Sequence, residues 1–351
     1  MEQIVGRIVQ LKDSGESWED IKKKISEEVG RTFTIDQLRS KFRLREKSPE
    51  PAEPTTPLSL SDKSVDEITA KDFIEDFKRT QSFRQKFSIK ELQTEKHIKS
   101  DTPIALTFIS DPHLGSPYTD YDSFWADIER VRNNDSLWCV KGGDFSDKFM
   151  SQFKDKSAPV NQLAPAQQQL LAVEKIMEYI EDKIVAAIGG NHDRMDEKLT
   201  GISTEYFIHR GKSFPYMPHG GLIKLTVGET EYKILIKHSY RFGSSLNLFN
   251  SHHRMLEILA PDCDIVVQEH EHNPGIESLE KFEFDQKRTV INIRTGSYKL
   301  NDPYSMDYFK AGRIAPQTII LWPDRKKVLA MHGAEAISDA LIYLDGTKKK
   351  R

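Results

Sequence analysis

The stretch PIALTFISDPHLG, residues 103–115, decides the fold. Its first part is an apolar run with β-branched and aromatic residues, which is typical of a buried strand. Its second part places Asp111 and His113 two residues apart, directly after that strand and before a Leu-Gly turn. Such a pair on its own is more often a cap or a turn than a site. Its meaning therefore depends on whether other strands end in partners for it.

Four later apolar segments end in the same way. They are LWCVKG (137–142), IVAAIG (184–189), YKILIK (232–237) and DIVVQE (264–269). The polar residues that follow the five strands are Asp111, His113, Asp144, Asp147, Asn191, His192, Asp193, His238, His270 and His272. Ligands of α/β sheets bind at the carboxyl ends of strands, so these five loops are expected to meet at one edge.

The pattern around these strands predicts an α/β domain in which one sheet packs on another. Helical periodicity recurs between the strands, around residues 122–133, 162–183 and 249–259, and the sequence is rich in strand formers up to about residue 331. We assign residues 101–335 to this domain. Residues 336–351, which end in TKKKR, are expected to form a C-terminal tail.

Residues 1–47 are predicted to form a separate small all-α domain. Apolar residues at helical spacing, Gly15 as a stop and Ser17 as an N-cap delimit two short helices, and TIDQLRSKFRLREK (34–47) predicts a third. Three short helices joined by tight turns match a helix-turn-helix layout.

The third predicted helix carries most of the basic residues of this small domain, and the candidate DNA contacts on it are Arg39, Lys41 and Arg43. The alternative is a helical interaction module with a solvated basic face, because the first half of the domain is acidic. Residues 48–65 are rich in Pro, Ser and Thr and predict a flexible linker. Residues 66–100 carry charges at helical spacing and are expected to form a helical connector.

The composition narrows the class of protein. A chain of 351 residues with 37% hydrophobic residues is long enough for one large domain and a smaller one. The net charge of −3 does not attract nucleic acid as a whole, so affinity for phosphate must come from a local patch or from metal ions. Cys139 and Cys263 lie in apolar runs and imply no disulfide framework. With no signal-peptide core and no membrane-length apolar run, we expect a cytoplasmic protein without a membrane partner, and its oligomeric state stays open.

The residues at the strand ends suit metal ions. Asp, His and Asn form a mixed oxygen and nitrogen set that suits Mn²⁺, Fe, Zn²⁺ or Co²⁺ rather than a Ca²⁺ cage. Seven ligands are too many for one ion with open positions, but they suit two ions ~3.5–4 Å apart that share a bridging carboxylate. A hydroxide between the ions would then be the nucleophile, because both ions lower its pKa.

In order, the motifs read DPH, GDFSD, GNHD, KHS and EHEH, and over roughly residues 103–335 the chain resembles the calcineurin-like metallophosphoesterase superfamily. The resemblance implies a layered αββα sandwich and two divalent ions, with Mn²⁺ as the first candidate, bridged by Asp144. The other implied ligands are Asp111, His113 and His272 for one ion and Asn191, His238 and His270 for the other. His192 would lie over the phosphate to stabilise charge or donate a proton, and Asp147 and Asp193 would orient Asn191 and His192.

One position departs from the family pattern, because Glu269 stands where the last motif has glycine. A side chain there can narrow the pocket or reach a ligand. Tyr298 and Lys299 follow a strand and are candidates for the rim of the same edge, whereas His219 belongs to no constellation. The candidate contacts to substrate phosphate are Arg194, Tyr240 and Arg241, which are explained equally well as ordinary loop residues.

The expected activity is hydrolysis of phosphodiester bonds, with DNA as the first candidate substrate. SDPHLG and GGDFSD are similar to motifs in the SbcD-type subunits of double-strand-break repair nucleases, and a tethered helix-turn-helix would raise the local concentration of DNA. The alternatives are a phosphatase or phosphodiesterase for nucleotides or small phosphoesters with a regulatory N-terminal module, and a non-catalytic DNA-binding scaffold. The intact ligand set argues against the scaffold, and GNHD in place of RGNHE argues against a protein-serine/threonine phosphatase.

Overall fold

A computed structural model describes residues 7–8, 10–12, 14–30, 32–35, 38, 69–87, 92–148, 162–244, 246–283, 286–300 and 312–348. The chain divides into two compact units, Met1–Ser88 and Ile89–Arg351. The candidate DNA contacts Arg39, Lys41 and Arg43 and the linker at 48–65 lie outside the described residues. In the part of the chain that the structure describes, no helix combines the length and the apolar character needed to span a bilayer.

The first unit holds helix α2 (Trp18–Val29) and helix α4 (Ala70–Phe87). The Ser17 side chain accepts a hydrogen bond from the backbone N–H of Asp20, so it is the N-cap that the sequence predicts. Gly30 ends α2 in the left-handed conformation, at φ 67°. The buried apolar side chains that pack together here are Ile8, Leu11, Ile21, Ile25, Phe33 and Leu38.

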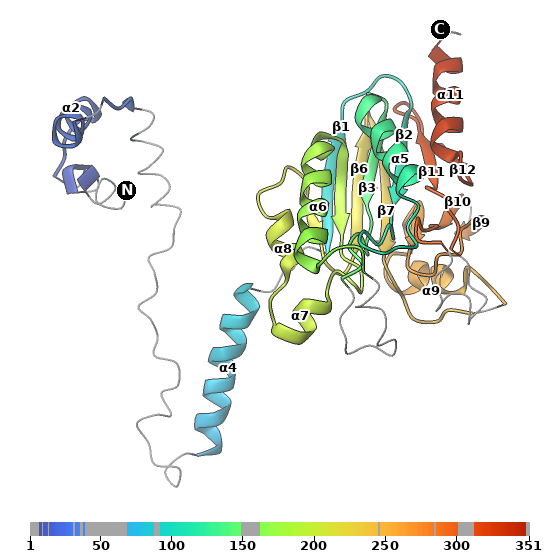
Figure 1. Cartoon of the computed structure of the whole chain (residues 1–351), viewed down its shortest axis with the longest axis horizontal. Coiled ribbons are helices and arrows are strands. Elements are labelled where there is room, and N and C mark those ends of the chain that lie inside the picture. Colours follow the sequence, from blue (N-terminus) through green and yellow to red (C-terminus); the bar gives the residue numbers. More distant parts are fainter. Residues whose placement is uncertain are drawn as a thin grey trace. The chain divides into compact units, whose positions relative to one another are not determined.

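The second unit is built on two six-stranded sheets (Figure 1). The first has the order β1-β6-β7-β8-β10-β9, from Gln93–Ile98, Gly221–Val227, Thr230–Lys237, Ile265–Gln268, Gln286–Arg294 and Gly275–Glu283. The second has the order β12-β11-β2-β3-β4-β5, from Val328–Met331, Thr318–Leu321, Ile104–Ile109, Leu137–Lys141, Ile184–Ile188 and Tyr216–Met217. Strands β2 to β5 run parallel in the second sheet, and β7, β8 and β10 run parallel in the first.

Three apolar layers hold the sheets and helices together. Side chains such as Phe108 and Val140 from one sheet and Ile223 and Ile234 from the other form the core between the sheets. The helices α5 (Tyr121–Asn133), α6 (Ala166–Tyr179) and α11 (Ala336–Lys348) cover the second sheet, and α9 (Asn250–Ile258) covers the first. The short helices α7 (Met195–Thr200), η3 (Glu181–Lys183) and α8 (Thr204–His209) lie in the connections. The predicted αββα sandwich is therefore confirmed.

Two sequence assignments were wrong at the edges of this domain. Residues 93–98, which we placed in a helical connector, form edge strand β1 parallel to β6. QTEKHI leaves three of its six side chains exposed and buries only Ile98, so the sequence lacks the apolar pattern of a strand and only pairing with β6 makes it one. Residues 336–348, which we placed in a tail, form α11, whose side chains Ile337, Ala340 and Leu344 are buried against the sheet.

Candidate metal centre

Five loops carry the polar residues of the centre, and each follows the carboxyl end of a parallel strand. They follow β2, β3 and β4 in one sheet and β7 and β8 in the other. The sequence repeats Gly before Asp144 and before Asn191 because the loops touch. A side chain on Gly143 would collide with His238, and one on Gly190 would collide with Asp144.

The backbone at the centre is held in an unusual conformation. Left-handed φ angles are costly for residues with a Cβ, and such residues gather at functional sites. Five of the residues implied as metal ligands have them: Asp111 (53°), His113 (48°), Asp144 (54°), His270 (74°) and His272 (55°). Backbone hydrogen bonds lock two of these loops to each other, from Asp111 N to Gly143 O (3.0 Å) and from His113 N to Asp144 O (3.1 Å).

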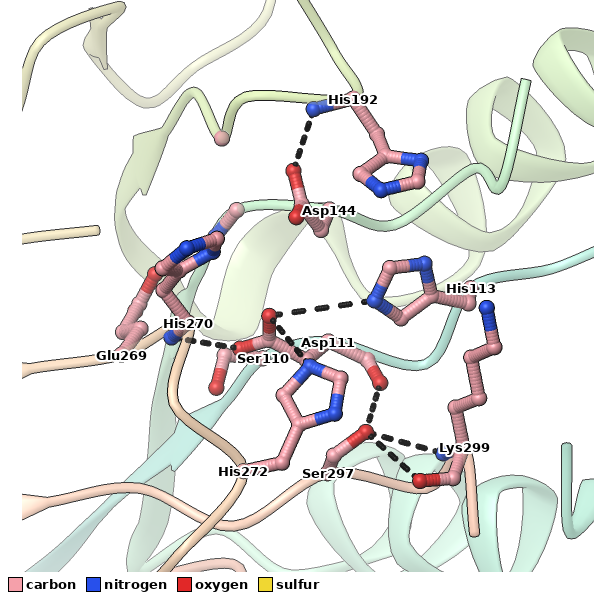
Figure 2. Close-up of polar contacts among 12 residues, drawn as sticks. Ser110, Asp111, His113, Asp144, His192, Glu269, His270, His272, Ser297 and Lys299 are labelled. Atoms are coloured by element: carbon pink, nitrogen blue, oxygen red, sulfur yellow. Dashed lines mark hydrogen bonds and ion pairs between the residues drawn. The ribbon is translucent and has the colours of Figure 1, made fainter. Parts of the chain in front are cut away.

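The first group of candidate ligands is Asp111, His113 and His272, whose ligand atoms lie within 4.8 Å of one another (Figure 2). Asp111 Oδ1 lies 3.3 Å from His272 Nε2 and 4.0 Å from His113 Nε2. A hydrogen bond also holds the backbone of Asp111 in place, because Ser297 Oγ donates to the Asp111 carbonyl oxygen at 2.7 Å.

The second group is Asp144, His238 and His270, whose ligand atoms also lie within 4.8 Å of one another. His238 Nε2 lies 3.1 Å from Asp144 Oδ2 and 3.0 Å from Asn191 Oδ1, so the predicted amide ligand is in the same place. His238 Nε2 is also 3.9 Å from Asp111 Oδ1, which sets the two groups side by side. The structure thus brings together all seven residues implied as ligands.

The chemistry of this donor set fits divalent cations. Asp111 and Asp144 are buried carboxylates, and an unpaired buried charge is unfavourable. Burial opposes the charge on His238, yet Asp144 and Asp111 raise its pKa well above the usual value. Among the described residues the buried Nε2 of His113 has no hydrogen-bond partner, although it faces Asp111. Burial, with nearby Lys299, lowers the His113 pKa to about 4, so the imidazole stays in the neutral form that binds metals.

Asp147 and His192 flank the first group. Asp147 Oδ1 lies 2.9 Å from His113 Nδ1 and 3.3 Å from Lys299 Nζ, so the carboxylate orients the candidate ligand His113 and not, as we expected, Asn191 or His192. The backbone N–H of His192 donates to Asp144 Oδ1 at 2.8 Å, and His192 Nδ1 lies 2.5 Å from the carbonyl oxygen of Asp147. The rings of His192 and His113 meet edge to face at 4.7 Å, which places His192 beside the centre.

Asp193 has a different task from the one we expected. Its Oδ2 accepts from the backbone N–H of Asp144 (2.8 Å) and of Gly190 (2.9 Å), so it ties two loops together through their backbone rather than orienting the side chains of Asn191 and His192. Lys141 Nζ lies 3.7 Å from the same oxygen. The geometry explains the residue type, since a carboxylate can accept both N–H groups at once.

Buried lysine and carboxylate side chains surround the Asp193 carboxylate, and the sequence did not predict this network of charges. Lys141 Nζ lies 3.4 Å from Glu205 Oε2, and Lys148 Nζ lies 3.6 Å from Asp196 Oδ2 and donates to the Asp193 carbonyl oxygen at 3.0 Å. Burial raises the Glu205 pKa to about 7. The sequence gives only a weak indication of this network, which is the lysine Lys141 at the end of an otherwise apolar strand.

Glu269, the departure from the family pattern, reaches a candidate ligand. Its Oε2 accepts from the backbone N–H of Gly143 at 2.8 Å and lies 3.1 Å from His238 Nδ1. The side chain is fully buried, and burial raises its pKa. A carboxylate on the second ring nitrogen fixes the ring orientation and raises its basicity as a ligand. Glu269 is therefore a positioning residue for His238.

Replacing Glu269 by glutamine is expected to weaken binding of Mn²⁺ by about 10- to 100-fold, because the carboxylate that orients His238 loses its charge. Competition between the protein and a chelator of known affinity measures this directly, without turnover. The matched control is Glu280→Gln, which removes an exposed carboxylate paired with Lys287. Equal Mn²⁺ affinity in Glu269→Gln and wild type would show that Glu269 does not position the ligand.

The other residues that the sequence suggested for the site lie in different places. Arg194 and Tyr240 line one pocket beside His238, whereas the Arg241 guanidinium lies over the Phe242 ring at 4.8 Å. Lys299 reaches Asp147, as described above. Tyr298 was wrongly placed at the rim: it is buried, and its hydroxyl donates to Asp127 at 2.8 Å in the layer under α5.

Three comparisons relate this chain to known proteins. No protein of curated function matches the sequence. Two similar solved structures are TT1561 of Thermus thermophilus and the hypothetical protein PH1004 from Pyrococcus horikoshii. The first has 10% identity and TM-score 0.36, covering 66% of this chain and 99% of the other; the second has 12% identity and TM-score 0.24, covering 78% and 88%. The model of the calcineurin-like phosphoesterase family matches residues 104–335. The chain therefore belongs to the calcineurin-like phosphoesterases, a family of metal-dependent hydrolases.

Proposed function

We propose that this protein is a dinuclear metal-dependent phosphodiesterase that acts on DNA. The observation that carries the proposal is the pair of ligand groups around Asp111 and Asp144, placed side by side at the carboxyl ends of five strands. Mn²⁺ is the proposed ion, since carboxylate, amide and imidazole ligands together suit it. Divalent ions at such a centre activate water and neutralise charge on phosphoryl oxygens.

His192 is the residue of this chain that would transfer a proton in the reaction, and two hydrogen bonds set its position. Because a carbonyl oxygen only accepts, the Asp147 carbonyl keeps a proton on His192 Nδ1 and turns Nε2 into the nitrogen that exchanges a proton with the leaving oxygen. The bond from His192 N to Asp144 Oδ1 fixes that histidine relative to the centre. A His192→Ala variant is therefore expected to bind Mn²⁺ as tightly as wild type in competition with a chelator, and to hydrolyse bis-p-nitrophenyl phosphate more slowly.

The choice of a diester and of DNA rests on sequence. SDPHLG and GGDFSD resemble motifs of SbcD-type nucleases, and the helical N-terminal unit with its basic third segment suits a DNA tether. We also propose a cytoplasmic location, because both cysteines are buried and unpaired.

A substrate panel with metal reconstitution tests the proposal. Release is measured from bis-p-nitrophenyl phosphate, p-nitrophenyl phosphate and end-labelled DNA in the presence of Mn²⁺. Hydrolysis of the diester and of DNA is expected. Hydrolysis of the monoester alone would favour a phosphatase for nucleotides or other small phosphoesters, and no hydrolysis with any ion would favour a scaffold.

The DNA tether makes a separate prediction. Removing residues 1–65 is expected to lower DNA affinity and to reduce the slope of log affinity against log salt by roughly one for each phosphate that this segment neutralises. Fluorescence anisotropy with a labelled duplex across a salt series, in EDTA to prevent cleavage, measures both. An Arg39→Gln/Lys41→Gln/Arg43→Gln variant of the full chain is the matched comparison. An identical slope in all three proteins would remove DNA binding from the N-terminal unit.

A further inference from the structure

A second polar pocket lies beside the candidate metal centre and shares a wall with it. It has a volume of about 260 Å³ and is lined by Arg194, His219, Lys237, His238 and Tyr240, among others. Lys237 is the last residue of β7, and Arg194 is the N-cap of α7. His238 belongs to the second ligand group, so whatever fills the pocket lies next to the candidate metal centre.

The pocket is basic, and hydrogen bonds hold its two cationic side chains, Arg194 and Lys237, in place. Arg194 Nε donates to the Gly190 carbonyl oxygen at 3.0 Å, and Arg194 Nη1 lies 2.6 Å from His219 Nδ1. Lys237 Nζ donates to the His219 carbonyl oxygen at 2.8 Å. None of the described residues that line the pocket carries a carboxylate.

The histidine adds a donor in a defined direction. A guanidinium only donates, so the close contact with Arg194 makes His219 Nδ1 an acceptor and leaves its ring proton on Nε2. Two fixed cations and one oriented N–H around a cavity form a site for a phosphate group, because guanidinium and ammonium groups bind phosphate oxygens through charge-assisted hydrogen bonds.

We propose that this pocket, formed by Arg194, His219 and Lys237, binds a second, non-scissile phosphate of the substrate. The inference rests on the proposed function and narrows its substrate class. A substrate with one phosphate occupies only the metal centre, whereas a nucleic-acid strand or a phosphorylated dinucleotide places one phosphate at the centre and the neighbouring one in the pocket. The pocket therefore selects substrates that carry adjacent phosphates.

Three dinucleotides that differ by one phosphate test this. The dinucleoside monophosphate dTpdT has only the scissile phosphate, pdTpdT adds a 5′ phosphate, and dTpdTp adds a 3′ phosphate. Wild-type protein with Mn²⁺ is expected to prefer one of the two phosphorylated forms over dTpdT by about tenfold or more in kcat/KM, chiefly through KM. Lys237→Gln and Arg194→Gln are expected to reduce that preference by about tenfold, and thermal melting checks that both variants fold.

Lys233→Gln is the matched control, because Lys233 lies on the same strand but pairs with Asp262 outside the pocket. It is expected to keep the preference. Equal kcat/KM for all three dinucleotides in wild type, or an unchanged preference in Lys237→Gln, would overturn the proposal.

Calorimetric titration of the metal-free protein with the same dinucleotides separates the pocket from the reaction. Tighter binding of a phosphorylated form that is lost in Lys237→Gln supports the pocket even if no dinucleotide is cleaved, in which case the proposed diesterase activity fails by itself. Cleavage of bis-p-nitrophenyl phosphate without any such difference in binding leaves the proposed function intact and removes the second phosphate site.

Discussion

Replacing Asp144 by alanine is expected to remove bound metal and to lower kcat/KM for bis-p-nitrophenyl phosphate by roughly 10³-fold or more, which corresponds to about 4 kcal/mol of transition-state stabilisation. One oxygen of Asp144 lies 3.1 Å from His238 Nε2, and the other accepts from the His192 backbone N–H at 2.8 Å. The variant therefore loses both the carboxylate proposed to bridge the ions and the group that fixes His192.

The measurement combines metal content with rate. Wild-type protein stripped with EDTA is expected to lose activity and to regain it with Mn²⁺, while Asp144→Ala regains neither two ions per chain nor activity. Asp324→Ala, at an exposed carboxylate paired with Arg325, is the matched control and is expected to behave as wild type. Two tightly bound ions and a normal rate in Asp144→Ala would contradict the assignment of the centre.

Replacing Lys141 by methionine is expected to lower the free energy of unfolding by about 3–5 kcal/mol. Lys141 is buried, and its ammonium lies 3.4 Å from Glu205 and 3.7 Å from Asp193. Methionine fills similar space but leaves two buried carboxylates without this counter-charge, and removing one partner of a buried ion pair is much more costly than removing the pair. A loss of this size is a large share of the stability of an ordinary domain.

Urea denaturation of the metal-free protein measures this loss without the contribution of bound ions. Lys175→Met, at an exposed lysine paired with Glu178 on α6, is the control and is expected to change stability by less than about 0.5 kcal/mol. The double variant Lys141→Met/Glu205→Gln is expected to recover part of the loss, since one unpaired charge is removed. Glu205→Gln alone completes the comparison, and a double variant whose loss equals the sum of the losses in the two single variants would show that Glu205 does not depend on Lys141.

The candidate centre was predictable because its chemistry restricts residue types at places the chain marks clearly. Asp111, Asp144 and His238 each follow an apolar strand, and the ends of parallel strands converge whatever the details of packing. The sandwich was predictable for the same reason, since the apolar runs and the helical segments between them are long and regular.

The features that the sequence did not predict depend on contacts between residues far apart in the chain. Glu269 could be seen as a departure, but its bond to His238 joins residues 31 positions apart. Lys141 is charged at the end of a strand, where lysines normally reach solvent, and only the fold surrounds it with Asp193 and Glu205. Strand β1 follows the same rule, because its pairing with β6 and not its own sequence makes it a strand.

The left-handed backbone at Asp111, His113, Asp144, His270 and His272 has an evolutionary consequence. A glycine at any of these positions would adopt this conformation without strain, so selection for an unstrained backbone alone would favour glycine there. The five side chains are therefore explained by what they do at the centre and not by what they contribute to folding.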